Sequence, residues 1–308
     1  MPTRKTDRIP GDSIVYKRCR PADLMPAIRL VLHTLNHLRC ATGKKPIRPR
    51  LKKVPPIWRH LYRQDRRGFW GAWHNGHLVG LAAAIQREKQ WYLAYLFVHP
   101  KYQDRKIGRL LLEKVWCDGP EFSHSLTTFT FNMRAVGLYS QLGMVPICGL
   151  PLMSAGRSRL RLNGKPALAA ERSIDRYDLT WITALEKRVR GYRRPQEWGF
   201  WKNRKDVTIN IFRAGRKRVG YSLVSDDGLI GPAGAVSDKY LVQVIDSTIK
   251  TCPPKKGKEF YLWCPTINMR LYRYLIETGF RCREMELFMS DKDYADFKRY
   301  VPAMPAVF

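Results

Sequence analysis

Apolar residues alternate between helical and strand-like spacing along the chain, and this pattern predicts a mixed α/β protein. The clearest helical spacing joins Leu24, Ile28 and Val31, which follow Pro21. In the first half, the segments expected to form helices are 21–38, 57–64, 107–115 and 133–142. The segments expected to form strands are 13–18, 69–73, 77–86, 91–98, 126–131 and a run that begins at Met144.

The second half repeats this order of elements. Its expected helices are 178–190, 239–250 and 269–278, and its expected strands are 207–213, 219–224, 229–236, 260–264 and 281–289. The tripeptide 132–134 recurs as 268–270, and at the same offset Gly143 falls on Gly279. Such matches at one offset indicate a duplication. The alternative is one large domain, in which the similarity between the two halves arose by chance.

A stretch rich in Ser, Gly, Arg and Ala separates the two halves. The prediction is a disordered basic tail over residues 1–12, an N-terminal domain over 13–153, a linker over 154–172 and a C-terminal domain over 173–308. No run of about 18 apolar residues occurs, and the N-terminus does not resemble a signal peptide. We therefore expect a soluble, cytoplasmic protein without a membrane partner.

The charge of the chain is strongly positive. Fifty-six Lys and Arg residues face 26 Asp and Glu, a net charge of +30, which attracts anionic partners such as coenzyme A or nucleic acid. The segment 187–205 interleaves basic residues with Tyr192, Trp198, Phe200 and Trp201. These rings suit either base stacking or packing beneath the second domain. We favour packing, because no recognised RNA-binding motif lies in the segment.

Neither the cysteines nor the histidines form a metal-binding pattern. The seven cysteines are scattered and contain no C-x-x-C pair, which is typical of free thiols in a reducing compartment. His33 and His37 are four residues apart, but no acidic partner stands between them. We expect two surface or packing histidines and no metal.

The segment from Val98 to Leu112 carries the strongest chemical signal. A strand ends at Pro100, a polar turn follows, and an amphipathic helix begins. Unpaired N–H groups at such a helix start bind a diphosphate, and a glycine such as Gly108 permits close approach of the backbone. Lys106 and its neighbours add positive charge. The alternative is a plain strand–turn–helix crossover without a ligand.

This segment resembles motif A of the GNAT N-acetyltransferases, Q/R-x-x-G-x-G/A after V-x-P. Gln103 holds the first position, Gly108 holds that of the second glycine, and Lys106 stands where the family usually has its first glycine. Downstream, a second stretch resembles motif B, N-x-x-A-x-x-x-Y-x-x-x-G-F. Its matching residues here are Asn132, Ala135, Tyr139, Gly143 and Met144.

The resemblance implies two tandem GNAT-like domains, each a mostly antiparallel twisted sheet flanked by helices. It implies acetyl-CoA or another acyl-CoA as co-substrate, and direct acyl transfer to a primary amine on a small molecule or a protein. The second domain is interpreted as degenerate, since Leu275 stands where the repeat would place Tyr139. The residues implied to bind CoA are Leu96, Phe97, Val98, Gln103, Asp104, Arg105, Lys106, Ile107, Gly108, Arg109 and Asn132.

Two residues are candidates for the proton transfers. The resemblance implies that Tyr139 donates a proton to the departing CoA thiolate. Glu88 is a candidate general base because it directly precedes the strand 91–98, which has no carboxylate; a water chain or a plain solvated turn residue are the alternatives. The alternative function is a nucleic-acid- or ribosome-associated protein on a GNAT scaffold, catalytic or not.

Overall fold

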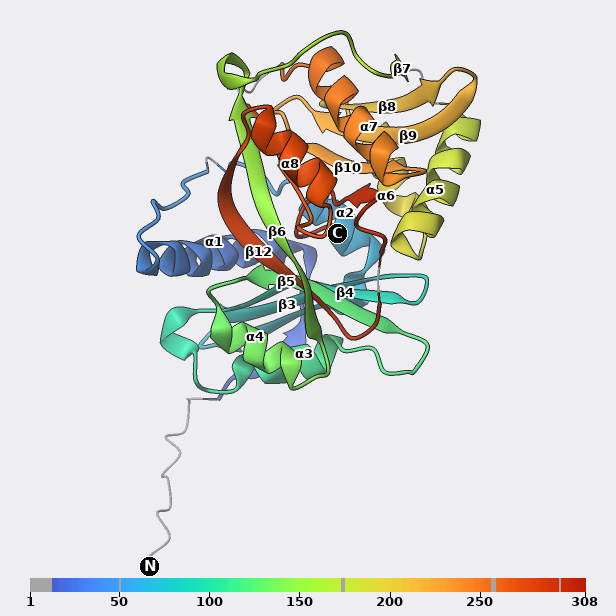
Figure 1. Cartoon of the computed structure of the whole chain (residues 1–308). Coiled ribbons are helices and arrows are strands. Elements are labelled where there is room, and N and C mark those ends of the chain that lie inside the picture. Colours follow the sequence, from blue (N-terminus) through green and yellow to red (C-terminus); the bar gives the residue numbers. More distant parts are fainter. Residues whose placement is uncertain (1–12, 50, 173–174, 256–258, 294) are drawn as a thin grey trace, which may run out of the picture. The chain divides into compact units, whose positions relative to one another are not determined.

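The computed structural model describes residues 13–49, 51–172, 175–255, 259–293 and 295–308. The tail predicted over residues 1–12 lies outside the described residues. Helices alternate with strands through the chain (Figure 1), and this confirms the predicted mixed α/β fold. The chain divides into two compact units: Met1–Gln86 with Leu93–Gly119, and Arg87–Tyr92 with Pro120–Phe308.

The first unit contains four strands in the order β1-β2-β3-β4. They are β1 (Val15–Arg18), β2 (Phe69–His74), β3 (His77–Arg87) and β4 (Gln90–Val98), although the last residue of β3 and the first three of β4 belong to the second unit. Its helices are α1 (Leu24–Ala41), α2 (Pro56–Gln64) and α3 (Ile107–Val115), with short 3₁₀ turns η1 (Pro21–Asp23), η2 (Arg66–Gly68) and η3 (Pro100–Tyr102).

Two local features fix the sheet of the first unit. Asn75 and Gly76 both have positive φ angles, 48° and 77°, as a two-residue hairpin between antiparallel β2 and β3 requires. Helix α3 then packs closely on β3 at Gly80. A Cβ atom there would lie 2.8 Å from Leu111 Cδ1 and 3.0 Å from Ile107 Cγ2. The glycine therefore allows α3 to rest directly on the strand.

The second unit contains two groups of antiparallel strands. The first has the order β5-β12-β6-β11 and consists of β5 (Ser123–Phe129), β6 (Val145–Gly156), β11 (Glu259–Trp263) and β12 (Arg281–Ser290). The second has the order β13-β10-β9-β8-β7 and consists of β7 (Ala169–Glu171), β8 (Val207–Ala214), β9 (Lys217–Ser225), β10 (Ile230–Ala235) and β13 (Tyr300–Val301). The helices are α4 (Met133–Ser140), α5 (Arg176–Arg190), α6 (Pro195–Lys202), α7 (Asp238–Thr251) and α8 (Met269–Glu277), with a 3₁₀ turn η4 (Arg157–Arg159).

Strand β12 lies between β5 and β6. Glu286 pairs in register with Phe129 of β5 on one side and with Leu150 of β6 on the other. A strand from the C-terminal part of the chain therefore completes a sheet with strands that the sequence assigned to the N-terminal domain. The two compact units have other bounds than the predicted domains. The predicted bounds describe where the repeated sequence begins and ends, and they stay a prediction.

The two copies of the repeated tripeptide have the same local structure. Asn132 and Asn268 each cap a helix, and their side-chain oxygens accept a hydrogen bond from the amide three residues later, at 3.3 and 2.9 Å. Their backbone angles are nearly identical. Each helix is followed, within three residues of its last residue, by a glycine with positive φ, Gly143 after α4 and Gly279 after α8. These matched caps are consistent with a tandem repeat.

A buried charged network joins helices α5 and α6, of which α6 was not predicted. The Glu186 carboxylate accepts hydrogen bonds from Arg194 Nη2 at 2.7 Å, Trp198 Nε1 at 2.7 Å and Tyr221 Oη at 3.2 Å. Arg194 Nη1 also donates to the main-chain oxygen of Phe308 at 3.1 Å. Glu186 and both arginines that contact it are almost fully buried. Because the charges are paired and hydrogen-bonded, the network is tolerated in the core.

Replacing Glu186 tests how strongly this network holds the second unit. Glu186→Ala leaves buried guanidinium groups without their carboxylate, so the free energy of unfolding should fall by about 3–5 kcal/mol. The matched control is Glu171→Ala, which removes the partly exposed ion pair with Arg213 and should cost less than about 1 kcal/mol. Urea unfolding of the full chain measures both. Equal losses for the two variants would contradict the prediction.

Candidate functional site

The turn between β4 and α3 has the shape that an anion-binding loop needs. Gln103 Nε2 donates a hydrogen bond to the Val98 carbonyl at 3.1 Å and ties the turn to the end of β4. Asp104 and Lys106 then take left-handed conformations, with φ of 67° and 59°. Lys106 is the N-cap of α3, and its side chain makes no capping hydrogen bond. The loop therefore keeps a left-handed turn at Lys106 although a glycine would adopt it at lower cost.

The side chains of this loop divide into anchors and exposed charges. Ile107 is buried and fixes the first turn of α3 in the core, so only its backbone amide could meet a ligand. Arg105, Lys106 and Arg109 are exposed. A Cβ atom at Gly108 would meet only Val98 Cγ2, at 3.7 Å. A positive helix end with three nearby cations and an uncrowded glycine suits a phosphate group.

The last residues of β4 are accessible, whereas the beginning of the strand is not. Trp91, Tyr92 and Leu93 are buried, but residues 94–98 are half-buried. These residues include Leu96, Phe97 and Val98, whose backbone was predicted to bind pantetheine. Their partial exposure leaves this stretch of strand within reach of a ligand.

Histidine and tyrosine side chains surround the start of the loop. The rings of His33 and His99 stack with centroids 4.7 Å apart, and His74 Nδ1 lies 2.9 Å from Tyr102 Oη. Burial lowers the pKa of His99, and the nearby His33, Lys101 and His37 lower it further. His33 is exposed and stacks on His99, in agreement with the expectation of a surface or packing histidine. Within the described parts of the chain, no three His, Cys, Asp or Glu side chains are placed to hold a metal ion.

Tyr139 and Asn132, the motif B residues, both lie in the second unit. Tyr139 is on α4 and is 5% exposed, and burial raises the pKa of its phenol well above the usual value. The group is therefore protonated at neutral pH and able to donate a proton. The Asn132 side-chain oxygen caps α4 through the Ala135 amide, so the structure shows a capping role for it.

Glu88, the predicted candidate for a general base, lies in the turn between β3 and β4. Its φ angle is 50°, and its carboxylate lies 3.0 Å from Lys187 Nζ and 3.6 Å from Arg193 Nη1. Partial burial would raise its pKa, but the hydrogen bonds and positive charges of these two residues lower it overall. A paired carboxylate with a lowered pKa is a weak proton acceptor, so this geometry favours an ion-pairing role for Glu88.

Sequence reasoning overlooked a second carboxylate, Glu286 on β12. It is 7% exposed. Burial raises its pKa to about 8; the charge of nearby Glu284 also raises the pKa, whereas a hydrogen bond to Thr127 lowers it. Thr127 is half-buried, and its hydroxyl lies 3.3 Å from Tyr92 Oη. The available signal was an acidic residue directly before the apolar run 287–289. Only the pairing of β12 with β5 connects it to Thr127.

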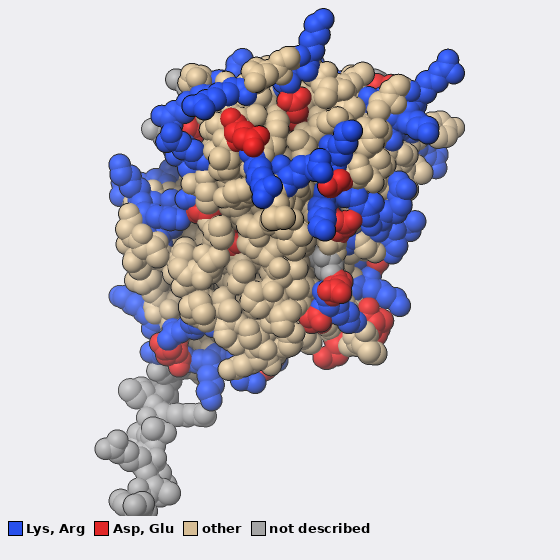
Figure 2. All heavy atoms as spheres, viewed as in Figure 1, with Lys and Arg blue, Asp and Glu red and all other residues tan. Residues whose placement is uncertain are grey.

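The aromatic residues of the segment 187–205 do not form a stacking surface. Tyr192, Trp198 and Trp201 are buried, and Trp198 packs edge-on against Trp201 at 5.1 Å. The packing interpretation of these rings is confirmed. On the face that Figure 2 shows, Lys and Arg side chains lie mainly in the upper and side regions, with smaller groups of Asp and Glu between them. No helix in the described part of the chain is long and apolar enough to cross a membrane.

Comparisons with known proteins relate the chain to acetyltransferases by family and by fold. Residues 34–144 match the Acetyltransferase (GNAT) family. A solved structure from Pyrococcus horikoshii, assigned to the acetyltransferases, aligns over 99% of both chains with a TM-score of 0.75 and 15% identity. A GCN5-related N-acetyltransferase from Sphaerobacter thermophilus aligns over 93% of this chain and 98% of its own, with a TM-score of 0.64 and 14% identity. A search of curated proteins finds no sequence match.

A further GCN5-related N-acetyltransferase, from Kribbella flavida, aligns over 91% of this chain and 71% of its own, with a TM-score of 0.56 and 13% identity. At these identities the alignments show a shared fold, and they include both halves of the chain. The family match includes the left-handed loop before α3 and the helix that carries Tyr139. Residues 34–144 therefore match the GNAT acetyltransferase family, and the chain has the fold of the GCN5-related N-acetyltransferases.

Proposed function

We propose that the protein is an acyl-CoA-dependent N-acyltransferase, with acetyl-CoA as the donor and a primary amine as the acceptor. The observation that supports this most directly is the loop from Gln103 to Gly108. It follows the half-buried end of β4, turns left-handed at Asp104 and Lys106, and opens a helix whose N-cap side chain leaves the first-turn amides uncapped. Such a helix start is an anion site.

The loop would hold the diphosphate of acyl-CoA. The first-turn amides of α3 would donate hydrogen bonds, the helix dipole would favour negative charge, and Arg105, Lys106 and Arg109 would add Coulomb attraction. The backbone of Leu96, Phe97 and Val98 would hold pantetheine and polarise the thioester carbonyl. These assignments follow the family resemblance and the exposure of each group.

The proposed chemistry is a direct transfer. The neutral amine nitrogen attacks the thioester carbon, a C–N bond forms, and the C–S bond breaks. The amine loses one proton to a general base, and the departing thiolate sulfur receives one proton from the Tyr139 phenol. A tyrosine phenol is protonated at neutral pH, and burial raises the pKa of Tyr139 further, so the hydroxyl holds the proton that a donor needs.

We further propose Glu286 as the general base. A base for an amine needs a pKa near the working pH, and burial brings the pKa of Glu286 to about 8. Its neighbour Thr127 is half-buried, so the carboxylate has a polar partner that is not sealed from solvent. Glu88, in contrast, is held by two cations that lower its pKa. Of these two carboxylates, Glu286 is the better proton acceptor.

Blocking the glycine at the helix start tests the diphosphate site. Gly108→Leu adds a side chain where the fold has room, so the melting temperature should not fall, because leucine is the better helix former. The shift in melting temperature that CoA produces should shrink, with Kd raised at least about tenfold. Gly199→Leu on α6, where an added Cβ also meets no atom within 4 Å, is the control. Undiminished CoA binding by Gly108→Leu would remove the loop from the site.

Replacing Tyr139 by phenylalanine tests the proton donor. Tyr139→Phe keeps the ring in the core and removes only the hydroxyl, so kcat should fall by roughly 100-fold while CoA still raises the melting temperature as in the wild type. Steady-state kinetics and a thermal shift titration measure the two effects. Unchanged turnover would exclude Tyr139 as the general acid.

The pH profile tests Glu286. If Glu286 is the base, kcat/KM of the wild type should rise with pH, reach half of its maximum near pH 8 and level off above it, as the carboxyl loses its proton. Glu286→Gln should be roughly 100-fold slower, without this rise, and should bind CoA normally. Glu284→Gln, on the same strand, should keep the rise but shift it to lower pH, because the Glu284 charge raises the pKa of Glu286. A rise that persists in Glu286→Gln would contradict the assignment, while CoA binding tests the proposed function separately.

The stability of Glu286→Gln gives an independent check. The folded state holds the Glu286 proton more tightly than the unfolded chain, whose pKa is near 4.5. Stability from this group is therefore present below pH 4.5 and is lost as the pH rises toward 8, by about 1.4 kcal/mol for each unit of difference. Glu286→Gln should remove this part of the pH dependence of unfolding, and an unaltered pH dependence would show that Glu286 titrates normally.

A further inference from the structure

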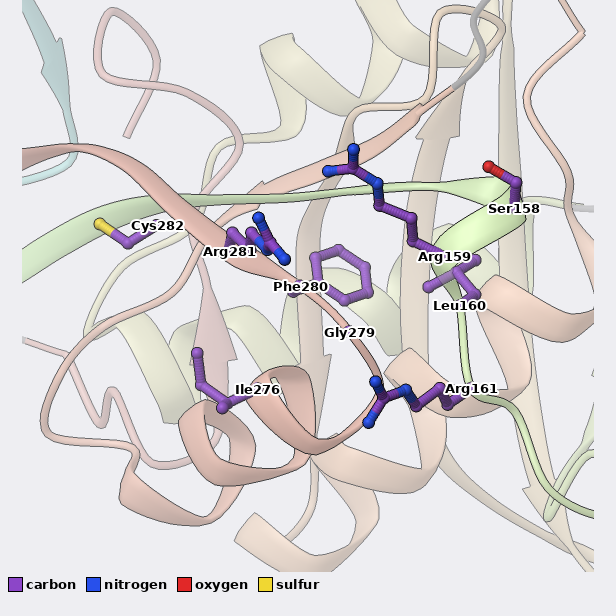
Figure 3. Close-up of a pocket in the computed structure, with 9 residues that line it drawn as sticks. All are labelled: Ser158, Arg159, Leu160, Arg161, Ile276, Gly279, Phe280, Arg281 and Cys282. Atoms are coloured by element: carbon purple, nitrogen blue, oxygen red, sulfur yellow. The ribbon is translucent and has the colours of Figure 1, made fainter.

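A pocket of about 780 Å³ lies in the second unit, where the end of α8 meets the segment after β6. Three arginines, Arg159, Arg161 and Arg281, line it together with Ser158 and Cys282. Figure 3 shows Arg159 and Arg161 on one segment and Arg281 on the other, with Phe280 and Gly279 between them. No motif or residue of the proposed acyl-CoA site belongs to this pocket.

The backbone around the pocket is closely packed. Gly279 has a φ of 99°, and a Cβ atom there would lie 2.4 Å from the carbonyl oxygen of Arg159. The Arg161 amide donates a hydrogen bond to the Thr278 carbonyl at 3.1 Å. Arg281 is held in register opposite Ser154 of β6. The three arginines therefore extend from two segments that are fixed against each other.

The pocket is positively charged, and its lining contains no carboxylate. Among the described residues, none of the three guanidinium groups forms an ion pair, although other arginines of the same unit do. Arg283, two residues along β12 from Arg281, lies 3.5 Å from Glu259 and donates to Ser154 Oγ at 2.8 Å. Three like charges around one concavity repel each other, and an anionic ligand would relieve this repulsion.

We infer that this pocket binds a small phosphate-bearing molecule. Guanidinium groups match the oxygen geometry of phosphate and donate paired hydrogen bonds to it, and the Ser158 hydroxyl adds a neutral donor. The volume falls in the range of small-molecule sites. Single-stranded nucleic acid fits less well, since the one ring in the lining, Phe280, is only 2% exposed and offers no surface for base stacking.

Cys282 provides a reporter within the pocket. Its side chain is exposed, and so is that of Cys40 on α1, which lies in the first unit. We would measure the rate of iodoacetamide alkylation at both cysteines by peptide mass spectrometry, with and without inorganic pyrophosphate, inorganic phosphate or AMP. A bound ligand should slow alkylation at Cys282 at least fivefold and leave Cys40 unchanged. AMP and pyrophosphate distinguish a nucleotide monophosphate from an inorganic diphosphate.

Variants of the arginines decide whether any protection comes from this pocket. The double variant Arg159→Gln/Arg281→Gln should lose the protection of Cys282, while its thermal response to CoA should stay unchanged. The control, Arg29→Gln/Arg188→Gln, removes the same charge from two exposed arginines outside the pocket and should keep the protection. The inference fails if no phosphate compound protects Cys282 at millimolar concentration, if both cysteines slow equally, if protection survives the double variant, or if only RNA protects.

Discussion

The position of β12 between β5 and β6 is the constraint on which the second unit depends. An antiparallel strand in the middle of a sheet satisfies the N–H and C=O groups of both neighbours. Without β12, β5 and β6 would each expose an unpaired edge. Because β12 comes near the C-terminal end of the chain, the strands of the motif B region are complete only when this late segment has paired. The same pairing puts Glu286 beside Thr127, and so creates the buried carboxylate that we propose as the base.

The residues after β12 cover one side of it and are held by the charged network of α5 and α6. The Phe308 ring stacks on Phe288 of β12 at 4.5 Å and lies 5.7 Å from the Tyr92 ring. The main-chain oxygen of Phe308 accepts a hydrogen bond from Arg194, and Arg194 also donates to the Glu186 carboxylate. Phe308 thus links the charged network of α5 and α6 to the aromatic packing on β12. The desolvation of Glu186 and Arg194 is compensated because the two groups form an ion pair and each makes further hydrogen bonds.

Periodicity predicted most helices and strands, because amphipathic spacing is a local property of the sequence. Helix α6 was overlooked since its aromatic and basic residues have no helical stripe of apolar positions, and its burial depends on partners such as Tyr221. The motifs predicted the loop before α3 and the helix of Tyr139. They could not indicate Glu286, whose environment arises from pairing with a strand about 160 residues earlier. They also could not reveal that cations surround Glu88.

A comparison of the starts of α3 and α7 supports the proposal that the chemistry belongs with the first half of the chain. At α7 the Ser237 hydroxyl accepts a hydrogen bond from the Tyr240 amide at 3.3 Å, and Asp238 accepts one from the Lys239 amide at 2.6 Å. Side-chain oxygens thus occupy that helix start, and a carboxylate there repels phosphate. At α3 the N-cap is a lysine with no capping bond. Leu275, fully buried where the repeat has Tyr139, completes the contrast, because it has no proton to donate. Side-chain oxygens therefore hold amides at the start of α7, whereas the α3 start, which we propose as the diphosphate site, has no capping bond from its N-cap side chain.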